Sequence, residues 1–353
     1  MKLNHIPLAR LLILVIASTL LISSCKNDTT STNNTNPSAY QATYLVSDVA
    51  SFNASRADPN LLNAWGIAIS NTGIFWIATN HSSMSVVYDR NGAQLISPVS
   101  IPARDSNAGG SPSGAIFNGT SDFGGAKFIF STEDGIIAAW NSGVTATQVA
   151  KSASDNGVYK GLALASNGSA NYLYATNFRE SKIDVYDKSF MPVSGMAFSD
   201  PNIPAGYGPF GIANIGGQLY ITYALKKLPD MMDDSAGLGH GYVDVFNSDG
   251  SFVKRFASQG NLNSPWGVVK SNDGFGSFKN SIVIGNFGDG RINAFDLNGN
   301  LLGQLKDKDS NPIVIDGLWG LAFNPIVGDP NFLYFTAGPN GEEDGTFGYV
   351  QLK

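Results

Sequence analysis

The chain has 353 residues, including 40 Gly, and only 14% of its residues are charged. Its formal net charge at pH 7 is −6, and a negative surface repels the phosphates of DNA and RNA, which argues against nucleic acid as a partner. The single cysteine, Cys25, excludes an internal disulfide.

The first 24 residues predict a lipoprotein signal peptide. Basic Lys2 and Arg10 accompany an apolar run from Leu11 to Ile22 that is short for a bilayer span. The run ends in Ile-Ser-Ser-Cys, which resembles a bacterial lipobox, and the resemblance implies cleavage before Cys25 and lipid on its sulfur. An ordinary secretory signal with an incidental Cys is the alternative.

Residues 25–38 predict a lipidated Cys followed by a flexible tether, because residues 26–38 hold no large apolar side chain. A flexible segment of this length has a root-mean-square reach of about 20 Å. We therefore expect an exported protein anchored through Cys25 to the bacterial outer membrane. Both the periplasmic face of that membrane and the cell surface are compatible with this sequence.

Residues 39–353 contain six similar units, each opened by a Gly that starts a short apolar strand. The glycines are 47 to 56 residues apart, and the opening phrases are WGIAI from Trp65, SGAIF from Ser113, KGLAL from Lys160, FGIAN from Phe210, WGVVK from Trp266 and WGLAF from Trp319. Repeats of this length that hold several short strands predict an all-β fold, a six-bladed β-propeller.

The last unit is one strand short at its C-terminal end. An alternating segment, residues 39–48, precedes the first unit and has no unit of its own. We expect it to pair as the outermost strand of blade six, which closes the ring and covers an exposed edge. A seventh blade is the alternative, but neither 49–64 nor 99–112 holds four strands.

Strand directions predict one face of the propeller that is rich in charged loops. The turn before strand one and the loop between strands two and three emerge on this face, which we call the decorated face; the opposite one is the plain face. Its loops carry His81, Glu133, Asp134, Arg179, Glu180, Asp233, Asp234, His240, Asp289, Glu342, Glu343 and Asp344. Grouped carboxylates focus negative potential on a binding or catalytic surface, although charged residues also occupy loops simply because loops are wet.

The residues before the six glycines should form a ring at the mouth of the channel on the decorated face. We take Trp65, Lys160, Phe210, Trp266 and Trp319, with Arg179 nearby, as candidate ligand-binding residues, because aromatic rings stack on sugars or other flat ligands. Packing between blades is the alternative role of these rings. The loop from Lys226 to Tyr242 is a candidate lid, or a passive insertion.

Catalytic and metal-binding candidates lie in the same loops. His81, His240 and Glu133 are the candidate catalytic residues, the histidines as general bases near neutral pH. Oxygen ligands for Ca²⁺ would come from Asp233, Asp234, Glu133, Asn286, Asp289 and Glu342. The sequence holds no EF-hand spacing and no HExxH, GxSxG or Walker motif.

Whole phrases of the chain resemble known propellers. SPWGVV, IDVYDKSF and NAFDLNGNL resemble the NHL-repeat type, while NLLNAWGIAIS, MDDSAGLGHGYVDVFNSDG, GNFGDGRINAFDLNG and FTAGPNGEEDGTFG resemble an uncharacterised family of exported bacterial six-repeat propellers. The resemblance implies the fold and export, but no activity. Six-bladed calcium-dependent lactonases and lyases share this architecture at the level of the fold.

Two functions of different classes follow. The first is a lipid-anchored envelope protein that binds a glycan, a peptide or a partner protein, since no coherent catalytic constellation is visible. The alternative is a hydrolase, lactonase or lyase assisted by Ca²⁺ at the channel mouth, with His81 or His240 as base. A structural envelope protein without a small ligand is a third possibility.

Overall fold

The computed structural model describes Met1 and residues 39–168, 170–324 and 332–353. The chain divides into two compact units, Met1–Thr35 and Asn36–Lys353, and every described residue except Met1 belongs to the second. The predicted lipidation site Cys25, the predicted tether and all of the predicted signal peptide except Met1 therefore lie outside the described residues. Within the described ranges, the chain forms no helix long and apolar enough to cross a bilayer.

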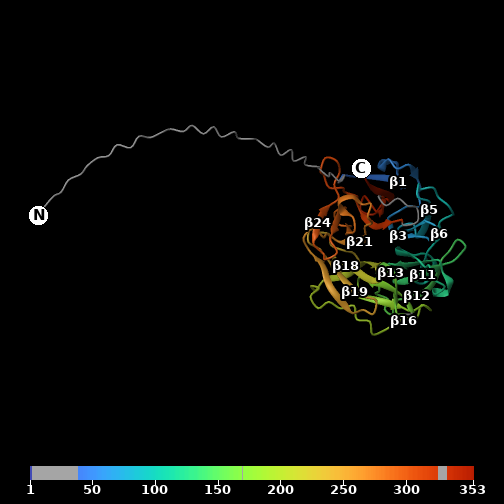
Figure 1. Cartoon of the computed structure of the whole chain (residues 1–353). Helices are drawn as coiled ribbons and strands as arrows, with labels where there is room; N and C mark the ends of the chain where they lie inside the picture. The colour runs from blue at the N-terminus through green and yellow to red at the C-terminus, as the bar shows by residue number, and fades with distance from the viewer. Residues whose placement is uncertain (2–38, 169, 325–331) are drawn as a thin grey trace. The chain divides into compact units, whose positions relative to one another are not determined.

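Six sheets stand around a common axis, which confirms the predicted six-bladed propeller (Figure 1). Blade one contains β3 (Ala64–Ile69), β4 (Phe75–Thr79), β5 (Met84–Tyr88) and β6 (Val99–Ser100). Blade two contains β9 (Pro112–Phe117), β10 (Phe128–Thr132), β11 (Ile136–Trp140) and β12 (Thr147–Lys151). Blade three contains β13 (Tyr159–Asn167), β14 (Ala170–Asn177), β15 (Lys182–Tyr186) and β16 (Pro192–Val193).

The second half of the ring repeats this order. Blade four contains β17 (Tyr207–Ile215), β18 (Gln218–Leu225), β19 (Gly241–Asn247) and β20 (Phe252–Ser258). Blade five contains β21 (Pro265–Lys270), β22 (Ile282–Asn286), β23 (Ile292–Phe295) and β24 (Leu301–Gln304). Blade six contains β25 (Leu318–Phe323), β26 (Phe332–Ala337) and β27 (Thr346–Leu352).

The N-terminal strand closes the ring as predicted. Strand β1 (Tyr40–Ser47) pairs antiparallel with β27, in a register that runs from Tyr40 opposite Leu352 to Ser47 opposite Thr346. A short strand that the sequence did not predict, β2 (Arg56–Ala57), pairs in parallel outside β1. The first and last segments of the propeller therefore share one sheet.

The glycine that opens each blade is required by the close approach of neighbouring inner strands. A Cβ added to Gly66 would stand 2.5 Å from the carbonyl oxygen of Ser113, and one on Gly211 only 2.0 Å from that of Trp266. On Gly320 it would meet the Trp65 carbonyl oxygen at 2.8 Å, which joins blade six to blade one. Any larger side chain would push blades apart, which explains why the repeat begins with Gly.

Apolar side chains fill the wedges between blades. In the described part of the chain, six buried clusters lie one at each interface between neighbouring blades. A seventh cluster lies on the axis and consists of Trp65, Phe178, Phe210, Ala224 and Trp319, with Trp266 and Phe287 packed against it. This axial cluster divides the channel into two ends.

Candidate functional site

The predicted aromatic ring is the axial cluster itself. Trp319 stacks on Trp65 with ring centroids 3.8 Å apart and on Phe287 at 3.7 Å, and Phe210 lies 5.8 Å from Trp319. Trp65, Phe210 and Trp319 are fully buried, so their faces are covered by one another. Trp65, Phe210 and Trp319 therefore pack between the blades, which is the alternative role that the sequence offered for them. Of the four aromatic residues before the glycines, Trp266 is the partly exposed one.

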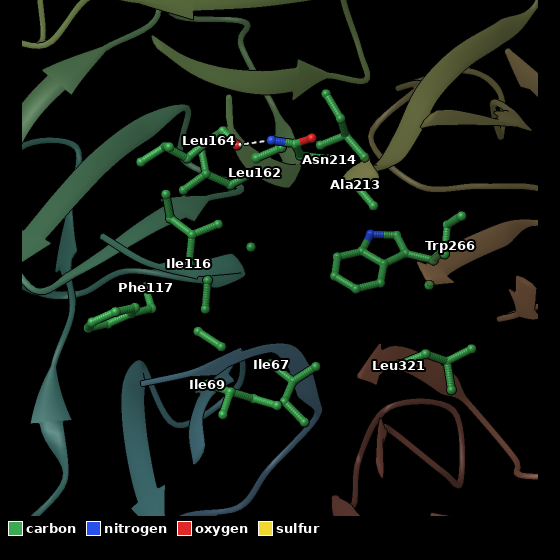
Figure 2. A pocket seen from close by; sticks show the side chains of 17 residues that line it. Ile67, Ile69, Ile116, Phe117, Leu162, Leu164, Ala213, Asn214, Trp266 and Leu321 are labelled. Atoms are coloured by element: carbon green, nitrogen blue, oxygen red, sulfur yellow. Dashed lines mark hydrogen bonds between the residues drawn. The ribbon is translucent and has the colours of Figure 1, made fainter. Parts of the chain in front are cut away.

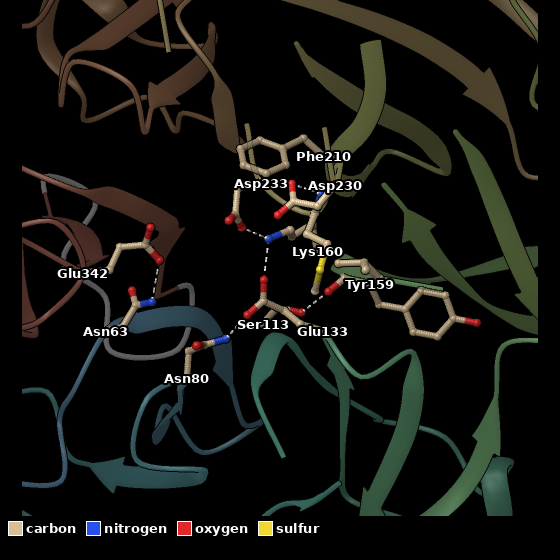
Figure 3. Close-up of polar contacts among 12 residues, drawn as sticks. Asn63, Asn80, Ser113, Glu133, Tyr159, Lys160, Phe210, Asp230, Asp233 and Glu342 are labelled. Atoms are coloured by element: carbon tan, nitrogen blue, oxygen red, sulfur yellow. Dashed lines mark hydrogen bonds and ion pairs between the residues drawn. The ribbon is translucent and has the colours of Figure 1, made fainter. Parts of the chain in front are cut away.

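The one cation of the ring, Lys160, is buried beneath the decorated face. Its side chain is 2% exposed, and its Nζ forms ion pairs with Glu133 and, at 3.2 Å, with Asp233 (Figure 3). The ammonium also lies 5.0 Å from the Trp65 ring centroid, a cation–π contact. Burial lowers the pKa of Lys160, but the charges of Glu133 and Asp233 outweigh burial and the pKa is raised. The ammonium is therefore charged at neutral pH.

Two buried asparagines hold carboxylates beside this lysine (Figure 3). Asn80 donates to Oε2 of Glu133 at 2.9 Å, and Asn63 donates to Oε2 of Glu342 at 2.7 Å. The Asn63 carbonyl in turn accepts a 2.9 Å hydrogen bond from Nε1 of Trp319. Burial raises the pKa of Glu342. Both carboxylates are thus oriented before any ligand arrives.

On the decorated face, these groups border a hollow of about 360 Å³. Its lining comes from blades one, two, four and six and consists of His81, Ser111, Glu133, Asp134, Asp230, Met232, Asp233, Gly341 and Glu342. Five of these residues carry carboxylates, against the single buried ammonium of Lys160. We call this hollow the acidic pocket.

The loop from Lys226 to Tyr242 forms one wall of the acidic pocket. It folds back on itself, because the amide of Lys227 donates to Asp233 O at 2.8 Å and that of Ser235 donates to Leu225 O at 2.7 Å. His240 contacts Ser235 O through Nδ1 at 2.8 Å and does not line the pocket. Of the two candidate bases, only His81 lies there.

The remaining candidates are spread over the face. Asn286 donates to Asp289 at 3.0 Å within blade five, and Asp234 lies in the long loop with a pKa raised by burial. Arg179 is partly exposed, and its carbonyl oxygen accepts a hydrogen bond from Lys226.

Of the six predicted calcium ligands, Glu133, Asp233 and Glu342 line the acidic pocket, whereas Asp234, Asn286 and Asp289 are not part of its lining. Among the residues that the structure describes, no three His, Cys, Asp or Glu side chains are arranged to hold a metal ion. Glu133 and Asp233 instead pair with the Lys160 ammonium, which stands where a cation would be needed.

Asn63 is the site residue that the sequence reasoning missed. Asn63 stands two residues before Trp65, and Asn263 stands three residues before Trp266. Both asparagines lie at the start of a blade. Asn263 accepts a hydrogen bond from the amide of Gly237 in the long loop. A polar residue repeated just before an inner strand was the available signal.

The plain-face end of the channel has different chemistry. A cavity of about 390 Å³ lies between the inner strands there, as Figure 2 shows. Its lining includes Ile67, Ile69, Ile116, Phe117, Leu162, Leu164, Ile212, Trp266 and Leu321. Asn214 supplies the polar side chain of this lining, and it donates to Leu164 O at 2.9 Å. We call this cavity the apolar end.

Comparisons with solved structures support the architecture. No protein-family profile matches the chain. The fold resembles virginiamycin B lyase from Staphylococcus aureus, with 14% identity, a TM-score of 0.54 and coverage of 89% of this chain and 99% of the other. It also resembles a gluconolactonase from Xanthomonas campestris, with 13% identity, a TM-score of 0.53 and coverage of 83% and 88%. At such identities the likeness shows the fold alone.

Sequence relatives are closer. Uncharacterized protein R648 of Acanthamoeba polyphaga mimivirus is 35% identical over 329 residues, which span 88% of this chain and 80% of that protein. Uncharacterized protein L690 of the same virus is 36% identical, with coverage of 88% and 85%. These relatives are viral, so the bacterial source and the export implied by the sequence resemblance stay predictions. The chain belongs to the same family as the mimivirus proteins R648 and L690 and is a six-bladed β-propeller.

Proposed function

We propose that this chain is a lipid-anchored binding module of the cell envelope, whose acidic pocket holds a positively charged group of a peptide or partner protein. The observation that carries the proposal is the set of fixed carboxylates. Glu133 and Glu342 are oriented by Asn80 and Asn63, and Asp233 is held near Lys160. One ammonium offsets only part of the charge of five acids, so a cationic ligand completes the pocket.

The exposure of the acids supports binding rather than a purely structural role. The side chain of Asp233 is 64% exposed and that of Glu133 is 22% exposed, although both pair with the buried Lys160. Each therefore keeps oxygen lone pairs available toward the hollow. A Lys or Arg side chain supplies the matching donors.

The anchor is proposed from the sequence. The apolar run that ends at Ile22 and the following Ser-Ser-Cys predict lipid on Cys25, with residues 26–38 as the connection to the propeller. A lipid-anchored module would present its ligand site beside the envelope.

Calorimetry with defined probes tests the ligand class. Tetralysine amide should bind the wild type with one-to-one stoichiometry, and neutral tetraglutamine amide should not. Glucosamine is a third probe, because an amino sugar offers the same ammonium group. The double variant Asp233→Asn, Glu342→Gln should lose tetralysine binding, while Asp249→Asn in a plain-face turn should keep it. Equal binding by wild type and double variant would contradict the proposal.

The alternative function, a calcium-assisted hydrolase, lactonase or lyase, is supported less well by this geometry. The fold is shared with a lyase and a gluconolactonase, but two of the five acids of the pocket, Glu133 and Asp233, already pair with Lys160. Thermal melting in calcium and in chelator separates the two functions. Stoichiometric calcium in the purified protein, with a large fall in melting temperature on chelation, would favour the enzyme.

A further inference from the structure

An apolar patch lies on the outer rim of blades four and five. Its members are Phe252, Val253, Leu297, Leu301 and Leu302, each between 40% and 50% exposed. Strands β20 and β24 are the outermost strands of their sheets. We call these five residues the rim patch.

Contacts between blades four and five join the two parts of the rim patch at the turn that carries Leu297. Lys254 in β20 donates through Nζ to Leu297 O at 2.9 Å. A Cβ on Gly299 would stand 1.9 Å from Phe256 O, so the turn that carries Leu297 packs directly on β20. Exposed apolar residues that gather on neighbouring blades mark an interaction site more often than scattered single residues do.

Comparison of equivalent turns shows what is unusual about blades four and five. The turn YDRNGAQL of blade one aligns with FNSDGSFV of blade four and FDLNGNLL of blade five. At the two positions after the turn, blade one has Gln94 and Leu95, blade four has Phe252 and Val253, and blade five has Leu301 and Leu302. Consecutive strand residues face opposite sides, so these two blades are apolar on both sides of their outer strands.

The described chain begins beside this rim. Ala39 forms a parallel bridge with Lys306, and the Tyr40 amide donates to Lys306 O at 2.7 Å. Lys306 follows the end of β24 by two residues, so the entry point lies at most about 13 Å along the chain from Leu302. Fourteen peptide steps separate Cys25 from Ala39 and can span at most about 50 Å. A domain of this size is also about 50 Å across.

We propose that the rim patch rests on the interface of the lipid bilayer that holds the Cys25 anchor. This inference builds on the lipid anchor of the proposed function and adds an orientation. The rim of blades four and five is the apolar part of the propeller next to the entry point at Ala39. The outermost strands keep unpaired backbone groups, which fits the hydrated head-group depth and not the hydrocarbon core. The propeller then stands edge-on, and both ends of the channel stay clear of lipid.

Spin labelling of the full lipidated chain in phosphatidylethanolamine and phosphatidylglycerol vesicles tests this orientation. Cys25 is the only cysteine, so lipid on its sulfur leaves an introduced Cys as the single reactive thiol. Leu302→Cys is compared with Leu95→Cys, its counterpart in blade one, where the native side chains are 50% and 45% exposed. We expect the ratio of oxygen to nickel-complex collisions to be about threefold higher at 302 than at 95.

Each of the other outcomes would overturn a specific part of this proposal. If the wild type itself takes up the label at Cys25, the anchor fails, and the rim orientation fails with it. If the wild type is unreactive but labels at 302 and 95 have equal collision ratios, the anchor stands and the rim orientation is wrong. Spin–spin broadening at 302 that persists in detergent would show contact between two copies of the chain instead of lipid.

Discussion

The two ends of the central channel have opposite chemistry on the same scaffold. The acidic pocket is lined by loops and by carboxylates that Asn63, Asn80 and Lys160 hold in place. The apolar end is lined by the inner strands themselves, with side chains such as Ile67 and Leu162. Between them lies the buried axial cluster.

This contrast separates what builds the propeller from what can recognise a ligand. Residues of the inner strands follow the repeat and serve closure and packing. The loops between strands two and three differ from blade to blade, and they supply every carboxylate of the acidic pocket. Function is therefore expected to depend on loop residues, and stability on strand residues.

The largest effect is expected where the inner strands of blades four and five pack against each other. Gly211→Ala places a Cβ about 2 Å from the Trp266 carbonyl oxygen, so two blades must move apart. We expect a loss of about 3 kcal/mol in the free energy of unfolding, measured with urea. Gly119→Ala is the matched control, because its Cβ meets only the Phe117 ring at 3.5 Å, and it should change stability by less than about 0.5 kcal/mol. Equal effects would contradict the glycine-contact explanation.

The next effect is at the floor of the acidic pocket. Lys160→Met should lower the free energy of unfolding at pH 7 by about 2 kcal/mol, because Glu133 and Asp233 lose their counter-charge but can be partly rehydrated. Acidic pH should reduce this loss as the carboxylates take up protons. Since the pKa of Lys160 is raised, the wild type keeps this contribution below the ordinary value of 10.5 and loses it only at higher pH. Lys188→Met, at an exposed position, is the control.

A smaller effect, on binding, is expected from Glu342→Gln. It should weaken tetralysine binding about tenfold with little change in unfolding, because one charge-assisted hydrogen bond is lost. Burial raises the pKa of Glu342 above its ordinary 4.5, so wild-type binding should weaken with falling pH before pH 4.5 is reached. The folded-state pKa is raised, so this group makes folding more favourable as the pH falls through that pKa. Calorimetry from pH 8 to 5 should show a shallower decline for Glu342→Gln; parallel curves would exclude Glu342 as the titrating group.

The smallest effect on recognition is expected at the apolar end. Ile69→Asn should lower the free energy of unfolding by about 1 kcal/mol and leave tetralysine affinity unchanged. Urea titration and calorimetry on one preparation measure both quantities. A change in affinity would show that the two ends are coupled through the axial cluster.

Much of the fold was predictable because the repeat carries it. The six opening glycines and the missing last strand predicted six blades and closure by the segment that begins near Tyr40. The six blade sheets confirm the first prediction, and pairing of β1 with β27 confirms the second. The added strand at Arg56 and the hairpin of β7 (Pro102–Ala103) and β8 (Ser106–Gly109) were not predicted. They lie in single connections that no other blade repeats, so they gave no periodic signal.

The candidate site was predicted only in part. Strand direction placed Glu133, Asp233 and Glu342 on one face, and the structure brings them around Lys160. The burial of Trp65 and Trp319 could not be deduced, because an aromatic residue before the glycine suits both a stacking surface and a plug. Which acid pairs with Lys160 depends on contacts across blades that sequence spacing does not encode.

Hydrogen exchange of the full chain with and without tetralysine amide, followed by mass spectrometry, tests the central claim that the acidic pocket is the ligand site. We predict that added ligand slows exchange in the segments 132–135, 229–235 and 340–344. Slowed exchange around 67–69, 114–117 and 162–164, with the acidic loops unchanged, would place the ligand at the apolar end and contradict the claim.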